Sequence, residues 1–585
     1  MERARRLLFV GLVAAVLSLA AGRGAFAADR GADPILSALP EKPLMVCQME
    51  SPLVFIEAVR QTRIGEHVKG SAATSSFVDG CRDVLRLVAA VYTDLPDATW
   101  ERLVGREVAL LGFGPSGEPG TRPPFALALY LGGDAKIIKD AFEQQTLPRL
   151  QATNPELSVN KEQIGGGPVA VLRKGPDATC VRFVGDLVVI GTREAVAKFS
   201  PPASTPAWLG SAARPGGIAT AELNLEPLIA KARSDVSRSP GDRQGLEVTG
   251  LAGLTSIAAG TAVEDGGFKD TVAVHFRPGA SGLLPGVMAL KPGGARCAEV
   301  VPADYALVVS CQVESGEKLY ALIEDAVKQS AGEPGLQQFR AGMDQVDQAF
   351  AVNVEWELLP RIGNEAFFAV RAPGPDVVTA GRKPTEEDFA PIFGFAVKDE
   401  AALRDLLKRF GGSQQARQMG WQLITEGHEG NEVLTLNNIA GPARLSVAFL
   451  DGFLVCSRET QAVRSAISAV GAGKTLAKDA QYQQVQAHLP AQGNAYVYAD
   501  SRPLKPLLME ALRLRARPKA QPFLPLVERA VPDLGGYGLA LTSQGGDVKA
   551  EGYGDVPAAF TFLSLASIGA VTDQAKAAQR TTPGM

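Results

Sequence analysis

Apolar and polar positions along the chain form short strand-like runs, separated by runs with helical spacing. Residues 44–49 are an apolar run leading into Ser51-Pro52. This pair favours a helix start, because Ser caps a helix and Pro is tolerated at its first position. An apolar stripe at helical spacing follows: Leu53, Ile56 and Val59. Further strands are predicted at residues 107–112, 125–131, 169–173, 179–184 and 187–191.

Two tight turns between apolar runs predict β-hairpins. Gly185-Asp186 separates residues 180–184 from 187–190, and Asp451-Gly452 separates residues 444–450 from 453–456. Gly next to Asp is typical of two-residue hairpin turns. Residues 256–276 and 539–553 each predict one more hairpin, which closes its half of the chain.

The second half of the chain repeats this order of elements. Five matched pairs occur in the same order: Cys47 and Cys311, Gly105 and Gly363, Phe125 and Phe393, Phe183 and Phe449, Gly217 and Gly493. Their separation drifts between 258 and 276 residues, as loop insertions and deletions produce. We therefore predict an α+β fold of two tandem diverged repeats. Each repeat is expected to contain antiparallel sheet hairpins with helices packed on one face.

Length and composition support this division. A chain of 585 residues exceeds the roughly 250–300 residues that one core accommodates. We predict a signal peptide at 1–27, repeat one at 28–276, a Gly/Pro-rich linker at 277–296, repeat two at 297–555, and an apolar helix with a polar tail at 556–585. The net charge of −4, without a basic stripe, argues against nucleic acid as a partner.

The N-terminus has the pattern of a secretory signal. Basic residues at 3, 5 and 6 precede an apolar run at 7–21, and Ala25-Phe26-Ala27 supplies the small residues of a cleavage site. The apolar run is shorter than the roughly 20 residues that span a membrane. We expect cleavage after Ala27 and export to the periplasm or the medium.

The apolar run at 556–571 is also short for a membrane span. We expect it to form a docked amphipathic or buried helix. The alternative is a weak membrane association through this tail.

Six cysteines in so long a chain do not make a disulfide scaffold. Cys47 with Cys81, or Cys297 with Cys311, would suit an exported protein, and the sequence leaves the connectivity of all six open: Cys47, Cys81, Cys180, Cys297, Cys311 and Cys456. Without CxxC pairs, and with four His, the sequence predicts no metal site.

Three motifs resemble known sites in letters alone. Gly471-Ala472-Gly473-Lys474-Thr475 has Ser468 where a phosphate loop needs Gly, and it ends a helix instead of opening one. The GxGxxG at 112–117 is followed by prolines that forbid the helix this motif requires. The SxxK that begins at Ser315 lacks its companion elements, and N-capping explains Ser315.

The repeated Cys-Gln-x-Glu-Ser is the most conspicuous polar cluster. A thiol nucleophile needs a nearby base, and no His recurs between the halves, so Cys47 and Cys311 are interpreted as buried strand residues. Glu107 and Glu365 would lie on different repeats, and we expect a turn or strand-edge role for them. We therefore assign no catalytic, cofactor-binding or metal-binding residue, and no cofactor.

The recurring order of a Ser-capped helix, a Gly-x-Glu strand and a hairpin resembles a family of uncharacterised bacterial exported proteins, catalogued as a domain of unknown function. Residues 301–304, 363–365 and 449–457 carry the resemblance, which is expected to span most of the mature chain. This resemblance implies the predicted architecture, and it implies no particular activity because none is assigned to that family. Our hypothesis is a non-enzymatic envelope scaffold for a protein partner or an apolar ligand. The alternative is a hydrolase with its site between the two repeats.

Overall fold

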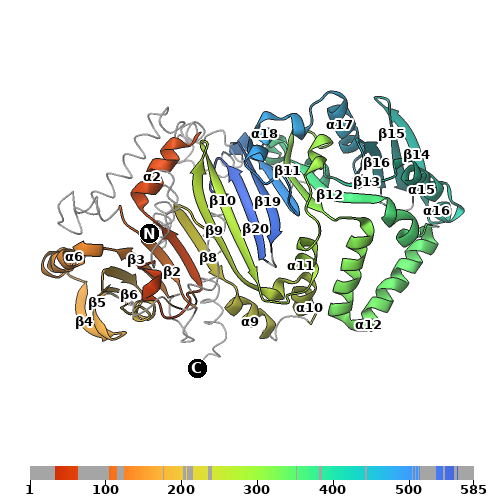
Figure 1. Cartoon of the computed structure of the whole chain (residues 1–585). Helices are drawn as coiled ribbons and strands as arrows, with labels where there is room; N and C mark the ends of the chain where they lie inside the picture. The colour runs from red at the N-terminus through yellow and green to blue at the C-terminus, as the bar shows by residue number, and fades with distance from the viewer. Residues whose placement is uncertain are drawn as a thin grey trace. The chain divides into compact units, whose positions relative to one another are not determined.

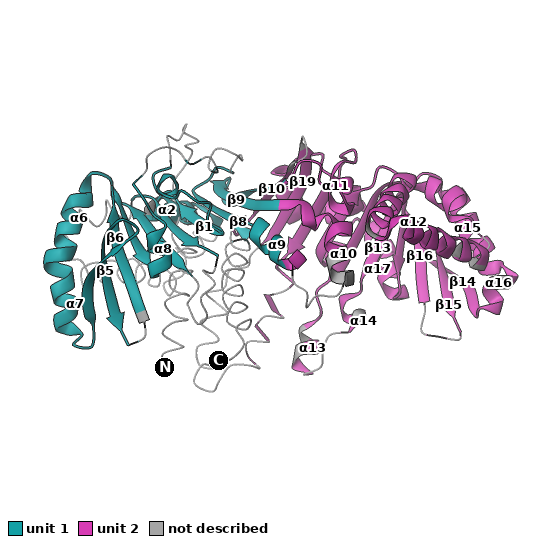
Figure 2. Cartoon of the chain, turned by 90° about the horizontal axis from the view of Figure 1, so that it is seen from below, with its two compact units in different colours: residues 1–231, 255–275, 557–585 teal, residues 232–254, 276–556 magenta. Residues whose placement is uncertain are grey.

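The computed structural model describes residues 33–63, 105–114, 124–201, 215–234, 240–503 and 535–558, with gaps at 176, 351, 381–384, 440, 442–443 and 545–546, and a few isolated residues such as Leu563. The predicted signal peptide and Cys81 lie outside the described residues. The chain forms two compact units (Figure 2). Unit 1 comprises residues 1–231, 255–275 and 557–585, and unit 2 comprises residues 232–254 and 276–556.

In the described residues of unit 1, ten strands pair in the order β10-β9-β8-β1-β2-β3-β7-β6-β5-β4 (Figure 1). The strands are β1 (Met45–Met49), β2 (Val108–Gly112), β3 (Phe125–Tyr130), β4 (Ser158–Ile164), β5 (Gly167–Lys174), β6 (Asp177–Val184), β7 (Leu187–Gly191), β8 (Ala219–Asn224), β9 (Leu254–Glu264) and β10 (Gly267–Phe276). The packed helices are η1 (Leu36–Ala38), α2 (Pro52–Gln61), α6 (Ala135–Ala141), α7 (Leu147–Thr153) and α8 (Arg193–Ala197).

The described part of unit 2 also contains ten strands, which pair in the order β20-β19-β18-β11-β12-β13-β17-β16-β15-β14. They are β11 (Tyr305–Gln312), β12 (Ile362–Arg371), β13 (Ile392–Val397), β14 (Trp421–His428), β15 (Asn431–Asn438), β16 (Arg444–Leu450), β17 (Phe453–Ser457), β18 (Ala495–Asp500), β19 (Gly536–Gln544) and β20 (Asp547–Gly554). Its main helices are α10 (Pro240–Thr249), α11 (Leu283–Met288), η6 (Arg296–Glu299), α12 (Gly316–Phe350), α15 (Glu400–Gly412), α17 (Thr460–Gly471) and α18 (Ala480–Ala487).

Each strand of unit 2 therefore has the same neighbours as the strand ten places earlier in unit 1. The registers differ in detail. In unit 1, Cys47 of β1 lies opposite Leu110 of β2. The match of Gly105 with Gly363 makes Phe368 the equivalent of Leu110, so Cys311 would be expected opposite Phe368. Cys311 lies instead opposite Ala366, two residues earlier in β12. Because side chains alternate between the faces of a strand, a shift of two residues leaves each one on its original face.

Helices cover both faces of the sheet in unit 1, so the prediction of helices on one face is wrong. Consecutive residues of β7 show why: Leu187 and Val189 pack in the core cluster that contains η1 and α8 residues, whereas Val188 packs in the cluster that contains α6 and α7 residues. A strand with apolar residues at successive positions must be buried on both of its faces.

The predicted helix start at Ser51 is confirmed. The Ser51 hydroxyl accepts a hydrogen bond from the Val54 N–H at 3.1 Å, and Pro52 is the first residue of α2. In the second unit the Lys318 N–H donates to the Ser315 hydroxyl at 3.3 Å, at the start of α12. Both serines therefore act in N-capping.

Helix α12 bends back on itself at Gly332, whose φ is 68°, and Pro334 follows the bend. Tyr320 and Phe339 bring the two arms together with ring centroids 5.9 Å apart. Despite its length, α12 is too polar to span a membrane, and no other helix in the described part of the chain is long and apolar enough to do so.

The tail at 556–571 lies mostly outside the described residues. Its Leu563 is buried in the unit 1 core together with Phe55 of α2 and Met45 of β1. At this residue, the tail packs against the folded body of unit 1.

The hairpins predicted at residues 256–276 and 539–553 are confirmed as β9–β10 and β19–β20. The two turns predicted at Gly185-Asp186 and Asp451-Gly452 are also present. Gly185 has φ 56°, and Asp451 and Gly452 have φ values of 44° and 81°.

We expect Gly452→Ala to lower the free energy of unfolding by about 1–2 kcal/mol, because a Cβ disfavours this left-handed backbone. Gly427→Ala in β14 is the control, since its backbone is ordinary and a Cβ there meets nothing within 4 Å. Urea unfolding of both variants measures the difference, and equal stabilities would contradict the expectation.

Candidate functional site

Glu365, one of the carboxylates that the sequence analysis considered, is 1% exposed in the interior of β12. Its carboxylate accepts three hydrogen bonds: from the Ser310 hydroxyl at 2.6 Å, the Arg296 N–H at 2.9 Å and the Cys297 N–H at 3.1 Å. The two N–H groups belong to the first turn of η6, where a carboxylate is favoured. The expected turn or strand-edge role is therefore wrong for Glu365, which fastens η6 to the sheet.

Unit 1 fastens its own short helix with different groups. The Gln48 amide nitrogen donates to Asp33 Oδ2 and to Glu107 Oε1, both at 2.6 Å. Asp33 Oδ1 in turn accepts from the Leu36 N–H at 2.9 Å and caps η1. Carboxylates are thus used in both units to hold the helix that precedes the first strand.

The cavity beside Ser310 has a volume of about 10 Å³, room for no more than one water molecule. Its lining includes Tyr482, Tyr496 and Tyr498. Burial raises the pKa of Tyr496 to about 12 and raises the pKa values of Tyr482 and Tyr498 further. These phenols stay protonated at neutral pH, so none of them can act as a general base there.

The proposed pairing of Cys297 with Cys311 is wrong, because both are free thiols. Cys297 packs in the core on the η6 side of the sheet, whereas Cys311, next to Ser310 and Gln312 in β11, points to the opposite face. Cys47 is buried in the unit 1 core, and Cys81 lies outside the described residues.

Burial raises the pKa of the Cys456 thiol from its ordinary value of 9.0 to about 12. At pH 8, a thiol with this pKa is about 0.01% thiolate, the form that reacts. We therefore expect iodoacetamide to label the half-buried Cys311 well before Cys456 in the folded protein, and to label both in urea, as read by mass spectrometry. Because the pKa of this thiol is higher in the folded than in the unfolded protein, its contribution to the free energy of unfolding is complete below about pH 9. That contribution is lost as the pH rises towards 12. Rapid native labelling of Cys456 would contradict its buried placement.

The remaining motifs have structural roles. Helix α17 ends at Gly471, and the Lys474 carbonyl then accepts from the Ala303 N–H at 3.0 Å, so the phosphate-loop-like segment is a packed turn. Gly112 is the last residue of β2, and the rest of its GxGxxG lies mainly outside the described residues.

Arg182 is a buried charge that the sequence analysis did not single out. Its guanidinium donates to the Phe199 carbonyl at 2.7 Å, the Gly165 carbonyl at 2.6 Å and the Val196 carbonyl at 3.3 Å. Two of these carbonyls lie at the C-terminal end of α8, where a cation is favoured. Burial lowers its pKa. The lone Arg within the apolar run of β6 was the signal that could have identified it.

His428, Glu429 and Ser468 meet at the tip of the β14–β15 hairpin. Ser468 Oγ donates to Glu429 Oε1 at 2.7 Å and lies 3.2 Å from His428 Nε2. Glu429 Oε1 lies 3.7 Å from that same nitrogen. In a hydrolytic triad, the acid and the serine contact opposite ring nitrogens, so this group does not have triad geometry.

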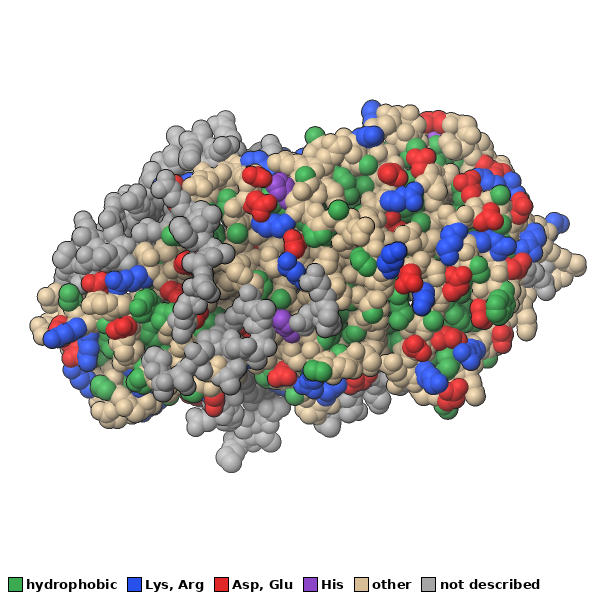
Figure 3. Space-filling model, in the orientation of Figure 1, with side chains coloured by type: hydrophobic (Ala, Val, Ile, Leu, Met, Phe, Trp, Pro, Cys, Tyr) green, Lys and Arg blue, Asp and Glu red, His purple; other side chains and the backbone are tan. Residues whose placement is uncertain are grey.

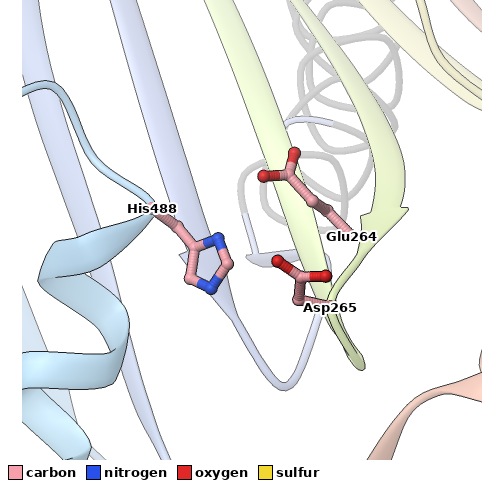
Figure 4. A group of neighbouring side chains, drawn as sticks. All are labelled: Glu264, Asp265 and His488. Carbon is pink, nitrogen blue, oxygen red and sulfur yellow. The ribbon is translucent and has the colours of Figure 1, made fainter.

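Figure 4 shows Glu264 and Asp265, which lie at the turn between β9 and β10 of unit 1, together with His488, which follows α18 of unit 2. The His488 ring stacks on Tyr553 of its own unit, with centroids 3.7 Å apart. The three residues belong to different units, and we assign no metal site to them.

One face of the central strands of unit 2 carries a row of apolar side chains that are partly exposed. Five residues lie directly opposite one another across five strands, and we call them the open row: Leu539, Val497, Val309, Phe368 and Phe393. Phe368, near the middle of the sheet, is 45% exposed, and the other four are half-buried. Figure 3 shows hydrophobic side chains of unit 2 reaching the surface between charged ones.

The corresponding face of unit 1 is closed. Met45, Cys47 and Met49 of β1 are buried there against Phe55 and Ala58 of α2 and against Leu563. In unit 2, Leu307, Val309 and Cys311 of β11 occupy this face and are all half-buried. The helix-covered face of the same strand is fully buried, as Val308 and Ser310 show.

A larger cavity of about 560 Å³ lies at the β19–β20 end of unit 2. Ser543 and Val548, opposite each other in the ladder, line it on the same sheet face as Leu539. Met288 and Pro285 of α11 line its other side. A cavity with a mixed polar and apolar lining therefore lies at one end of this face.

Comparisons with known proteins identify a family and no activity. A family model described as "Protein of unknown function (DUF3352)" matches residues 286–577, a narrower range than the expected resemblance over most of the mature chain. No curated protein matches the chain. A solved structure titled "Structure of crystal form III of TP0453" is 8% identical, covers 42% of this chain and 81% of its own, and has a TM-score of 0.19. Through residues 286–577, the chain belongs to the family described as "Protein of unknown function (DUF3352)".

Proposed function

We propose that the protein is an exported, non-enzymatic binding scaffold that holds a partner on the open row of unit 2. The observation that supports this most directly is Phe368, a large apolar side chain that is 45% exposed near the middle of a wide sheet. Burying apolar surface gains roughly 25 cal/mol per Å², so a partner that covers this row is favoured by the hydrophobic effect.

We also propose that the two units arose by duplication of one ancestral unit. The matched segments of the sequence and the recurrence of all strand neighbours support it. On this basis, the two units kept the same order of strands and diverged in what covers the sheet face that carries Cys47 in unit 1 and Cys311 in unit 2.

The described polar groups favour binding over hydrolysis. Glu365, Gln48 and Arg182 are used in hydrogen bonds that hold helices and loops to the sheets. The cavity beside Ser310 has no room for a substrate. The hydrolase alternative has no favouring arrangement among the residues that the structure describes within either unit.

The proposal is tested by chemical cross-linking of the tagged full-length protein in its source cells. We expect a discrete adduct of higher mass for the wild type and at least a tenfold loss of that adduct for Phe368→Asp. Trp356→Asp is the matched control, because Trp356 is 75% exposed in the η7 turn (Val354–Leu358) and lies outside the open row. An adduct that is equally abundant in all three proteins, or absent from the wild type, would overturn the proposal.

A further inference from the structure

We infer that the occupant of the open row is an amphipathic helix supplied by a partner protein. This inference rests on the proposed function and specifies the class of partner. It follows from three features of unit 2: the backbone pairing around the row, the size of the face, and the way in which unit 1 closes the same face.

The backbone pairing excludes strand addition at this site. Residues of the open row in β11, β12, β13 and β18 lie between two paired neighbouring strands. A partner strand needs an unpaired edge, where N–H and C=O groups are available. The open row offers side chains, so its occupant must bring a preformed apolar surface whose own backbone is already hydrogen-bonded. An α-helix meets that requirement.

The size of the face suits one or two helices. Five strands at about 4.8 Å spacing, with three outward residues each, span roughly 500 Å². The β13 end of this span is already packed within unit 2, because Phe393 and Leu407 of α15 lie against one core cluster. A stable interface between two globular proteins needs about 800 Å² from each partner. A helix about 10 Å wide that rises 1.5 Å per residue covers roughly 150–210 Å² with ten to fourteen residues, so one helix covers the part around Phe368 and two cover most of the face.

Unit 1 shows how this type of face is closed. Helix α2 is ten residues long and places Phe55 and Ala58, three positions apart, on the β1 face that carries Cys47. In unit 2, the face that carries Cys311 has Phe368 exposed instead. A partner helix with large apolar residues at positions i, i+3 and i+7 would bury Phe368 as α2 buries its own strands.

The test replaces Phe368 with a photo-crosslinking phenylalanine analogue in the full chain, in its source cells, and maps the adduct by mass spectrometry. We expect attachment to a segment of another protein with apolar residues at helical spacing. A synthetic peptide of that segment should gain helicity on binding the purified protein, as read by circular dichroism. Its affinity should fall at least tenfold with Phe368→Asp and stay unchanged with Trp356→Asp. Phe368→Ser serves as a milder variant if the aspartate impairs folding.

The other outcomes separate the two proposals. Attachment to lipid, to a strand segment or to a second copy of the chain would overturn the helix and leave the binding scaffold standing. A peptide that binds Phe368→Ser and wild type equally would also overturn the helix. Attachment within the same chain, or no adduct at all, would overturn both proposals.

Discussion

Glu365→Ala is expected to lower the free energy of unfolding of unit 2 by about 3–5 kcal/mol, because it removes the acceptor shared by two buried donors and one part-buried donor. The Ser310 hydroxyl and the N–H groups of Arg296 and Cys297 all lose the carboxylate that accepts their hydrogen bonds. Each unsatisfied buried donor costs about 1–3 kcal/mol. Glu365→Gln keeps the shape but turns an amide N–H₂ towards other donors, so we expect an intermediate loss of about 1–3 kcal/mol.

Hydrogen exchange makes this expectation specific to the site. The amides of Arg296 and Cys297 should lose protection in Glu365→Ala, beyond the loss seen in the unit as a whole. Glu387→Ala is the control, because Glu387 is exposed in α14 (Glu386–Phe389) and should change stability by less than about 0.5 kcal/mol. Unchanged protection at Arg296 and Cys297, with unchanged urea unfolding, would show that the carboxylate does not fasten η6.

A matched pair of substitutions tests the contrast between the two sheet faces. Phe55→Ala in unit 1 should cost about 3–5 kcal/mol, because the ring is 0% exposed and its removal leaves a cavity over β1. Phe368→Ala in unit 2 removes an identical side chain that is 45% exposed, and should cost less than about 1 kcal/mol in the isolated protein.

Urea unfolding followed by circular dichroism provides the measurement, with each variant compared with the wild type under the same conditions. Equal losses for the two variants would mean that the open row is covered as fully as the face of unit 1. That result would also remove the main support for a partner site on Phe368.

Local features of the chain were predictable because their causes are local. Ser51 caps α2 through its own hydroxyl, and the turns at Gly185-Asp186 and Asp451-Gly452 depend on residues that tolerate positive φ. Alternation in β1 correctly placed Cys47 and Gln48 on opposite faces. These predictions require no knowledge of what lies elsewhere in the chain.

The role of Glu365 was beyond the reach of sequence patterns. Its donors come from β11 and from η6, some 55 and 68 residues away along the chain, and nothing in the spacing indicates that they converge. In the sequence alone, Glu365 is equally consistent with a catalytic acid or base and with a structural carboxylate. In the folded protein, the Glu365 carboxylate is surrounded by three hydrogen-bond donors, and the cavity beside Ser310 has no room for a substrate. These surroundings distinguish a structural role from a catalytic one.

The class of the fold, the helix caps, the hairpins and the recurrence of segments between the two halves could all be read from local patterns in the chain. The coverage of each sheet face could not, because Phe55 and Phe368 are the same residue type and differ in what packs over them. The two-residue change of register between β11 and β12 likewise became visible only in the folded chain. Burial and register depend on contacts between distant segments, whereas caps, turns and alternation depend on neighbours in the chain.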